Sequence, residues 1–316
     1  MTQLRFNSWR GALIAMLVLL ALAGGGSGCT GKRENTVVVY AAQDQVYAEP
    51  IFAEFTRQTG IRVRPVFDSE AVKTVGLANR LLAEQTNPQC DLFWGNEELR
   101  ARQLAARGVF RQTNGLATFG YRTRRIVVNT NRLALAQAPR SLSELTNAVW
   151  REKVALAYPM FGTTATHFMA LRQQWGRERW QAWCQALQDN KPFLVDGNSV
   201  VVKLVARGEA LLGLTDSDDI AAAQREGLPV CALPTDPESL AIPNTLGLVR
   251  GSPHPAAADR LFAFLQTGEV LARLVRENAL EGSKADAATG IRVDWNRLIT
   301  ETGAAEETLR KIFLRQ

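Results

Sequence analysis

Three aspartates crowd one short segment in the second half of the chain, Thr215-Asp216-Ser217-Asp218-Asp219. Carboxylate oxygens hold hard cations, and they also form charge-assisted hydrogen bonds with ammonium groups. Asp44, which follows an apolar run in the first half, could join Asp218 and Asp219 in such a site. The simpler alternative is that each aspartate only caps a helix, a role that contributes about 0.5–2 kcal/mol. The segment therefore predicts a cation or metal site, with helix capping as the alternative.

A second polar segment, Asp196-Gly197-Asn198-Ser199, favours the opposite chemistry. It follows a short apolar run and opens a helix-periodic stretch, so backbone N–H groups at the helix N-terminus face outward and favour an anion. Similar junctions stand at Tyr40-Ala41-Ala42-Gln43-Asp44 and at Trp94-Gly95-Asn96-Glu97. Repeated polar strand ends predict a ligand cleft along one edge of the sheets.

The last of these junctions supplies two further candidates, Trp94 and Asn96. Trp94 is interpreted as a stacking wall or cation–π surface of the cleft, or alternatively as a core side chain that ends a buried strand. The histidines, His167 and His254, have no carboxylate or cysteine at motif spacing. No zinc-protease, serine-hydrolase or P-loop motif is present, so no catalytic residue is predicted and the chain is not expected to be an enzyme.

The elements that must position these residues alternate between strand and helix. Apolar runs predict strands at 36–40, 61–67, 91–94, 125–129, 154–158, 193–195, 211–215 and 246–249. Helical periodicity predicts helices at 46–59, 71–85, 97–107, 164–175, 178–188, 198–207, 217–226, 255–266 and 270–278. This α/β order implies mainly parallel sheets flanked by helices. We therefore expect two lobes joined by two crossings, lobe 1 from 36–127 plus 245–316 and lobe 2 from 128–244.

The N-terminus carries the pattern of an export signal. Arg5 and Arg10 precede an apolar run at 12–23, which is shorter than the roughly 20 residues that span a bilayer. Residues 1–28 are therefore predicted to be a cleaved signal peptide and 29–35 a tether. Small residues precede Cys29, so Cys29 is predicted to be lipidated; the alternative is ordinary cleavage with an incidental thiol. The mature chain is expected to be an exported, lipid-anchored monomer on the periplasmic or outer-surface side of the membrane.

Charge and cysteine content limit the possible partners. The formal net charge is +6, without a long Lys/Arg block or interleaved aromatic and basic residues. Nucleic acid is therefore not expected as a partner. The export signal permits a disulfide, and the sequence leaves open whether Cys184 and Cys231 form one.

Several segments resemble the solute-binding proteins of bacterial ABC importers. The resemblance is to the subgroup of ferric-iron-binding proteins with relatives for thiamine and phosphonates. Residues 37–42 (Val-Val-Val-Tyr-Ala-Ala) are similar to the opening strand of that family, and residues 51–63 to its helix-to-strand passage. Gly-Asn-Ser at 197–199 and Leu-Gly-Leu at 212–214 are similar to a second stretch of the family. The resemblance implies a two-lobe periplasmic binding protein, type II-like, that delivers a small ligand to an ABC permease.

The resemblance also implies how the anion would be held. The helix start at Gly162, Thr163 and Thr164 resembles one that binds an anion, with Asn198 as its partner and Ser199 beside it. Asp216 stands where the family has a further anion-contacting Asn.

The implied metal ligands differ from those of the iron-binding members. Asp218 and Asp219 stand where those members have two metal-binding tyrosines, and Asp44 where they have a histidine. These departures count against ferric binding through tyrosinate.

The two kinds of segment together predict a ligand, or a ligand pair, that carries both charges. A metal ion with an anion satisfies this, and so does a zwitterion such as an aminophosphonate. Apart from such a bound metal ion, no cofactor is expected. The predicted function is capture of a small solute for an ABC importer in a cleft between lobes that closes by a hinge motion. The alternatives are a ferric or other hard-metal carrier with Asp in place of Tyr, a binding subunit for a sensor, and a periplasmic hydrolase.

Overall fold

The computed structural model describes residues 35–67, 73–283 and 289–314. The elements below all lie in the compact unit formed by residues 36–316. The predicted signal peptide at 1–28 and the predicted lipidation site at Cys29 lie outside the described residues. Within the described part of the chain, no helix has both the length and the apolar composition needed to cross a membrane.

Three parallel strands form the first half of the sheet system. Strand β1 (Thr36–Ala41) lies between β2 (Arg62–Phe67) and β3 (Leu92–Gly95). The β-branched run of β1 is almost entirely buried, as expected for a central parallel strand. The helices that follow these strands are α2 (Gln45–Thr59), α3 (Lys73–Ala83) and α4 (Glu98–Ala106). Helix α2 ends where Gly60 adopts a left-handed conformation, with a φ of 67°.

A second set of parallel strands repeats this pattern. Strand β5 (Val154–Ala157) lies between β6 (Phe193–Val195) and β7 (Leu212–Asp216). The accompanying elements are α5 (Gly162–Trp175), α6 (Arg177–Asp189), α7 (Asn198–Arg207), α8 (Ser217–Arg225) and the short strand β8 (Val230–Ala232). Cys184 on α6 and Cys231 on β8 are free thiols, so the disulfide that the sequence left open is not formed.

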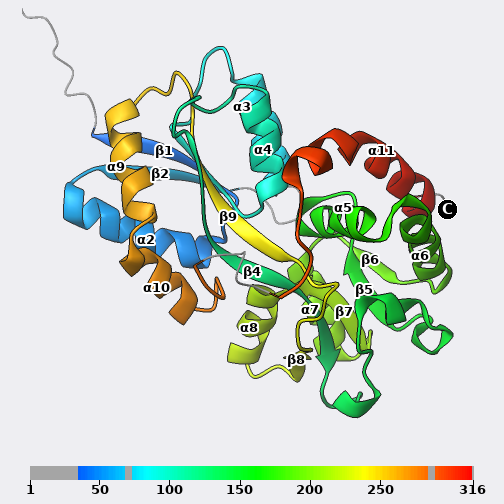
Figure 1. The fold of residues 1–316 in the computed structure, drawn as a ribbon. Coiled ribbons are helices and arrows are strands. Elements are labelled where there is room, and N and C mark those ends of the chain that lie inside the picture. The colour runs from blue at the N-terminus through cyan, green and yellow to red at the C-terminus, as the bar shows by residue number, and fades with distance from the viewer. Residues whose placement is uncertain (1–34, 68–72, 284–288, 315–316) are drawn as a thin grey trace, which may run out of the picture. The chain divides into compact units, whose positions relative to one another are not determined.

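Two antiparallel strands, β4 (Leu116–Asn129) and β9 (Ala241–Leu248), cross between the two sets (Figure 1). Strand β4 pairs with β9 over residues 116–123 and then with β7 over residues 124–128, while β9 also pairs with β3. Both crossing strands begin before the strands predicted at 125–129 and 246–249. The expectation of mainly parallel sheets holds within each set of three strands, because every antiparallel pair of the described strands includes β4 or β9.

The remaining described helices are the 3-10 helices η1 (Leu135–Gln137), η2 (Leu142–Thr146) and η3 (Ala148–Trp150), and the α-helices α9 (Pro255–Leu265), α10 (Gly268–Arg276) and α11 (Trp295–Phe313). Among them, α9 packs on β1 and β9.

Helix α11 is not predicted from the sequence. Its apolar side chains Leu309 and Phe313 join the core that includes Phe168 on α5 and Trp183 on α6. The rings of Phe313 and Phe168 lie 6.0 Å apart, and Figure 1 shows α11 beside α5 and α6. The lobe division predicted from the sequence assigns residues 245–316 to lobe 1, and α11 packs on α4 of that lobe as well as on α5 and α6 of lobe 2. The lobe division therefore stays a prediction.

Candidate ligand-binding site

One open cavity of about 530 Å³ gathers most of the residues that the sequence singles out. Ten of the eleven predicted ligand residues line it: Asp44, Asn96, Gly162, Thr163, Thr164, Asn198, Ser199, Asp216, Asp218 and Asp219. Each lies at or just beyond the carboxyl end of β1, β3, β5, β6 or β7. The carboxyl ends of parallel strands share one edge of a sheet, which is where open α/β proteins bind ligands. That these residues contact a ligand stays a prediction.

Trp94 is the exception, and the interpretation of it as a cleft wall is wrong. Its side chain is completely buried and does not line the cavity. It packs between Phe52 and Phe119, with ring centroids 5.6 Å and 6.0 Å away. Successive residues of a strand point to opposite faces of the sheet, and Trp94 points to the face that forms the core with α2. The alternative of a core tryptophan at the end of a buried strand is therefore correct.

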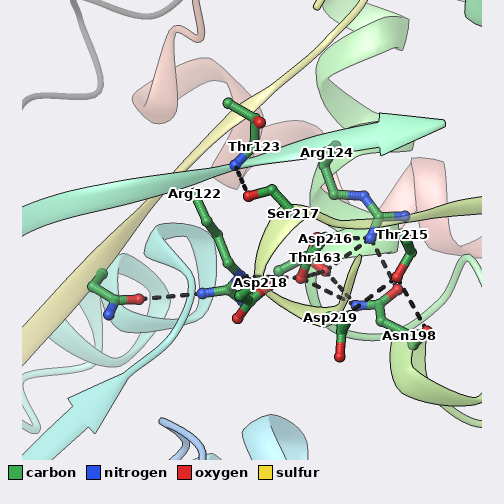
Figure 2. A network of polar contacts seen from close by, with 12 residues as sticks. Arg122, Thr123, Arg124, Thr163, Asn198, Thr215, Asp216, Ser217, Asp218 and Asp219 are labelled. Carbon is green, nitrogen blue, oxygen red and sulfur yellow. Dashed lines mark hydrogen bonds and ion pairs between the residues drawn. The ribbon is translucent and has the colours of Figure 1, made fainter. Parts of the chain in front are cut away.

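Asp216 is the centre of a polar network on the wall of this cavity (Figure 2). Its carboxylate accepts hydrogen bonds from Arg124 Nη1 at 2.8 Å and from Arg122 Nε at 3.1 Å. It also accepts from Thr163 Oγ1 at 2.9 Å and from Asn198 Nδ2 at 3.1 Å. Asp216 stands at the N-cap position of α8, but its side chain makes no capping hydrogen bond. Its role is to bind the two arginines, so helix capping alone does not account for it.

Two buried arginines that the sequence reasoning missed dominate the electrostatics of the site. Arg122 and Arg124 are 2% and 1% exposed and lie two residues apart on β4, so their side chains share one face. Arg122 donates to Asn244 Oδ1 at 3.2 Å, and its Nε lies 3.4 Å from Asp218. One sequence pattern could have indicated them: the two arginines alternate with Thr123 directly before the strand predicted from residue 125, so they could extend that strand with both side chains on one face.

The neighbouring aspartates have opposite pKa shifts. Burial raises the pKa of a carboxyl group, but at Asp216 the attraction of Arg124 and Arg122 outweighs burial and lowers the pKa below its ordinary value. At Asp218 burial prevails over the attraction of Arg122, and repulsion from Asp216 and Asp44 adds to it. The pKa of Asp218 is thereby raised to about 7. Its Oδ1 atom is buried and has no hydrogen-bond partner among the described residues. Asp216 is thus a fixed anion, whereas Asp218 changes charge near neutral pH.

Helix N-termini supply the opposite polarity in the same cavity. Helices α5 and α7 begin at Gly162 and Asn198, which line the cavity. Neither helix has a side-chain cap or an acidic residue in its first turn. Their first backbone N–H groups and helix dipoles therefore favour an anion. Helix α8 differs, because Asp218 and Asp219 occupy its first turn.

The same cavity could take a metal only at part of its acid cluster. Oxygens of Asp216, Asp218 and Asp219 all lie within 4.8 Å of one another. The oxygens of Asp216 are, however, engaged with Arg122 and Arg124, and two guanidinium groups repel a cation. Tyr47 also lines the cavity. Burial raises the pKa of Tyr47 although Arg225 acts to lower it, so the tyrosinate form is disfavoured. The donor set therefore fits a cationic group near Asp218 and Asp219 better than a ferric ion at all three aspartates.

Comparison with known sequences identifies the class of protein. The family model for bacterial extracellular solute-binding proteins matches residues 36–277, and the chain belongs to that family. Proteins of this family bind small ligands and deliver them to ABC permeases, and they are not enzymes. A similar protein of Salmonella typhimurium is 25% identical over 289 residues, which cover 83% of this chain and 81% of that protein. That relative is named as a candidate 2-aminoethylphosphonate-binding periplasmic protein.

Comparison with solved structures confirms the predicted two-lobe α/β binding-protein fold. The iron-bound protein HitA from Pseudomonas aeruginosa superposes with a TM-score of 0.75 at 19% identity, over 88% of this chain and 99% of HitA. The periplasmic binding protein AfuA from Actinobacillus pleuropneumoniae, with fructose-6-phosphate bound, gives 0.75 at 16% identity, over 89% and 99%. At these identities the likeness establishes the fold, and the ligand has to be argued from the cavity.

Proposed function

We propose that this chain binds a small zwitterion, which carries a cationic amine and a phosphonate- or phosphate-like group, in the cavity around Asp216. The observation that carries the proposal is the placement of opposite polarities in one cavity. The uncapped starts of α5 and α7 favour an anion, while Asp218 and Asp219 favour a cation.

The charge balance of the cavity argues against a lone anion. Six carboxylates and two guanidinium groups line it: Asp44, Asp196, Asp216, Asp218, Asp219 and Glu226, with Arg122 and Arg225. Helix-end interactions contribute about 0.3–1 kcal/mol each, which is less than the cost of a buried charge without compensation. A ligand that supplies its own positive group offsets this excess of acids. The 2-aminoethylphosphonate in the name of the Salmonella relative has this chemistry.

A hard-metal carrier is the second candidate, because the oxygens of Asp216, Asp218 and Asp219 lie close together. HitA, whose structure is described as iron-bound, is in keeping with a metal carrier. The two buried arginines on Asp216 weigh against it, since a metal would have to displace at least one of them.

Calorimetric titration with 2-aminoethylphosphonate tests the proposal. We expect wild-type protein to bind it, and to bind ethylphosphonate, which lacks the amine, at least about 30-fold more weakly, since an unpaired buried charge costs about 2 kcal/mol or more. Asp218→Asn combined with Asp219→Asn is expected to abolish binding. Asp259→Asn, which breaks only a surface pair with Arg111, is the matched control and should bind like wild type.

Two results would overturn the zwitterion. If the double variant binds 2-aminoethylphosphonate as tightly as wild type, the carboxylates are only structural. If native mass spectrometry of protein purified without refolding shows a bound iron, and the phosphonate does not displace it, the hard-metal carrier is the better conclusion.

The remaining parts of the proposal concern the cell. Lipid at Cys29 would anchor the protein as a monomer at the outer side of the membrane, where it would serve an ABC permease rather than a sensor. Replacement Cys29→Ser is expected to release the protein from the membrane fraction. Wild-type protein already found in the soluble periplasmic fraction would contradict the lipid anchor. Unchanged uptake of 2-aminoethylphosphonate by cells that lack this protein would contradict a role with an ABC permease.

A further inference from the structure

Arg124, whose Nη1 atom holds Asp216, also lines a second cavity of about 430 Å³. The apolar part of its wall comes from Ile126, Leu135, Ala138, Leu142, Leu214 and Leu233, and the rest is polar, with Arg140, Asp236 and Glu238 among its side chains. Leu135 is 56% exposed, so one side of this apolar lining meets solvent. None of the eleven residues predicted to bind the ligand lines this cavity.

Two buried polar atoms of this lining have no hydrogen-bond partner among the described residues: Arg124 Nε and His167 Nδ1. Both residues are 1% exposed. Buried polar groups in folded proteins are nearly always paired, so two orphaned atoms in the lining of one cavity indicate a missing partner.

The hydrogen-bonding roles of the two atoms are fixed. Arg124 Nε carries a hydrogen and can only donate. His167 Nε2 lies 2.7 Å from the carbonyl oxygen of Glu238, which can only accept, so the ring proton is on Nε2. Burial and the charge of Arg124 lower the pKa of His167 to about 3, so its ring is neutral. His167 Nδ1 is therefore an acceptor, so a single group that pairs with both atoms must both accept and donate.

We propose that this cavity is a second binding site, for a small neutral molecule with an apolar body and one hydroxyl group. The hydroxyl oxygen accepts from Arg124 Nε–H, and the hydroxyl hydrogen is donated to His167 Nδ1. A carboxylate would face the lone pair of His167 Nδ1, and an ammonium group would face Arg124. A single water that reached both atoms would have the same hydrogen-bonding capacity, but it would fill only roughly 30 Å³ of the space.

Cyclohexanol and methylcyclohexane are matched probes, because they differ only in the hydroxyl group that the proposal needs. In ¹⁵N-labelled protein, cyclohexanol is expected to shift the His167 Nδ1 resonance upon saturable binding. Methylcyclohexane should bind about tenfold more weakly, as expected for the loss of two modest hydrogen bonds. Ala136→Trp places a large side chain on an exposed lining position and should abolish cyclohexanol binding. Ala134→Trp lies two residues away and outside the lining, so this control variant should still bind cyclohexanol.

Equal affinity for the two probes would overturn the proposal, as would an unmoved His167 resonance or binding that survives Ala136→Trp. A crystal structure from a cyclohexanol soak that shows only water between Arg124 and His167 would also overturn it. These outcomes are independent of the zwitterion cavity, because titration with 2-aminoethylphosphonate reports on that cavity alone.

Discussion

Arg122 is enclosed by protein and lies against two carboxylates, Asp216 at 3.1 Å and Asp218 at 3.4 Å. Replacement Arg122→Met removes the charge and leaves both acids near an apolar side chain. We expect a loss of about 3–5 kcal/mol in the free energy of unfolding, as for other broken buried ion pairs. Urea denaturation measures this loss.

The control for Arg122 is its neighbour Arg125. Arg125 pairs with Glu281 at 3.1 Å in a partly exposed position, where an ion pair contributes about 0–1 kcal/mol. Arg125→Met should therefore cost far less than Arg122→Met. Equal losses for the two variants would show that Arg122 contributes no more than a surface charge.

Asp218 is expected to make ligand affinity depend on pH. Its raised pKa of about 7 means that it is ionised, and able to pair with an amine, mainly above neutrality. The affinity for 2-aminoethylphosphonate should therefore fall as the pH is lowered from 8.5 to about 5.5. Titration calorimetry across this range measures it, and Asp218→Asn corrects for titration of the phosphonate itself. A wild-type profile that parallels the variant would exclude Asp218 as the titrating group.

Asp218 should also make the free energy of unfolding depend on pH, in the direction opposite to its effect on ligand affinity. The folded pKa of Asp218 lies above its ordinary value of 3.8, so between these values the folded state holds one proton more than the unfolded state. The contribution of Asp218 to the free energy of unfolding therefore decreases as the pH rises through this window. Asp218→Asn should remove that contribution to the slope.

At the scale of elements, the crossing strand β4 contains an irregularity at Gly120. The register with β9 shifts between Phe119 and Tyr121, and Gly120 has a φ of +60°. A Cβ at Gly120 would also overlap Leu280 Cδ1. Gly120→Ala is therefore expected to cost about 2 kcal/mol or more in thermal or urea unfolding.

Gly303 is the matched control for Gly120. It lies inside α11, where a Cβ would meet nothing within 4 Å. Gly303→Ala should raise the free energy of unfolding by about 0.5–1 kcal/mol through helix propensity. Destabilisation by both replacements would mean that the bulge has no special requirement for glycine.

The elements differ in how far the sequence could predict them. The parallel strands and their helices were predictable, because β1 and β7 are short apolar runs followed by polar residues and helical periodicity. The start of β4 was not, because Arg122 and Arg124 are charged and only the fold buries them against Asp216. Helix α11 was missed because small and polar residues such as Thr302, Gly303 and Ala305 dilute its apolar stripe.

The candidate site shows the same limit. Polar residues at the ends of strands could be placed at one cleft from the order of elements, and ten of them line one cavity. The orientation of Trp94 depends on the exact register of β3, which a four-residue strand does not reveal. The buried charge partners come from a crossing strand far away in the chain, so no local pattern around Asp216 could indicate them.

At the scale of the whole molecule, residues from both sides of the crossing strands line the cavity, so ligand binding is expected to draw them together. Asp44 and Asn96 follow strands of the first set, and Gly162 and Asn198 follow strands of the second. Arg225 of α8 already reaches Tyr47 of α2, with a hydrogen bond of 2.7 Å. Small-angle scattering should show a smaller radius of gyration with saturating 2-aminoethylphosphonate than without it. An unchanged radius would contradict closure by a hinge.

The surplus of carboxylates around the cavity has a consequence for the rate of capture. Charges of one sign at the mouth of a cleft repel like-charged solutes within about one Debye length, roughly 8 Å at physiological ionic strength. Free phosphate would therefore encounter the cavity more slowly at low salt, and added salt would speed its arrival. A zwitterion of zero net charge feels little of this repulsion, and its positive end is drawn toward the acids first. Discrimination between the two solutes would thus begin during diffusion, before either one reaches the helix ends.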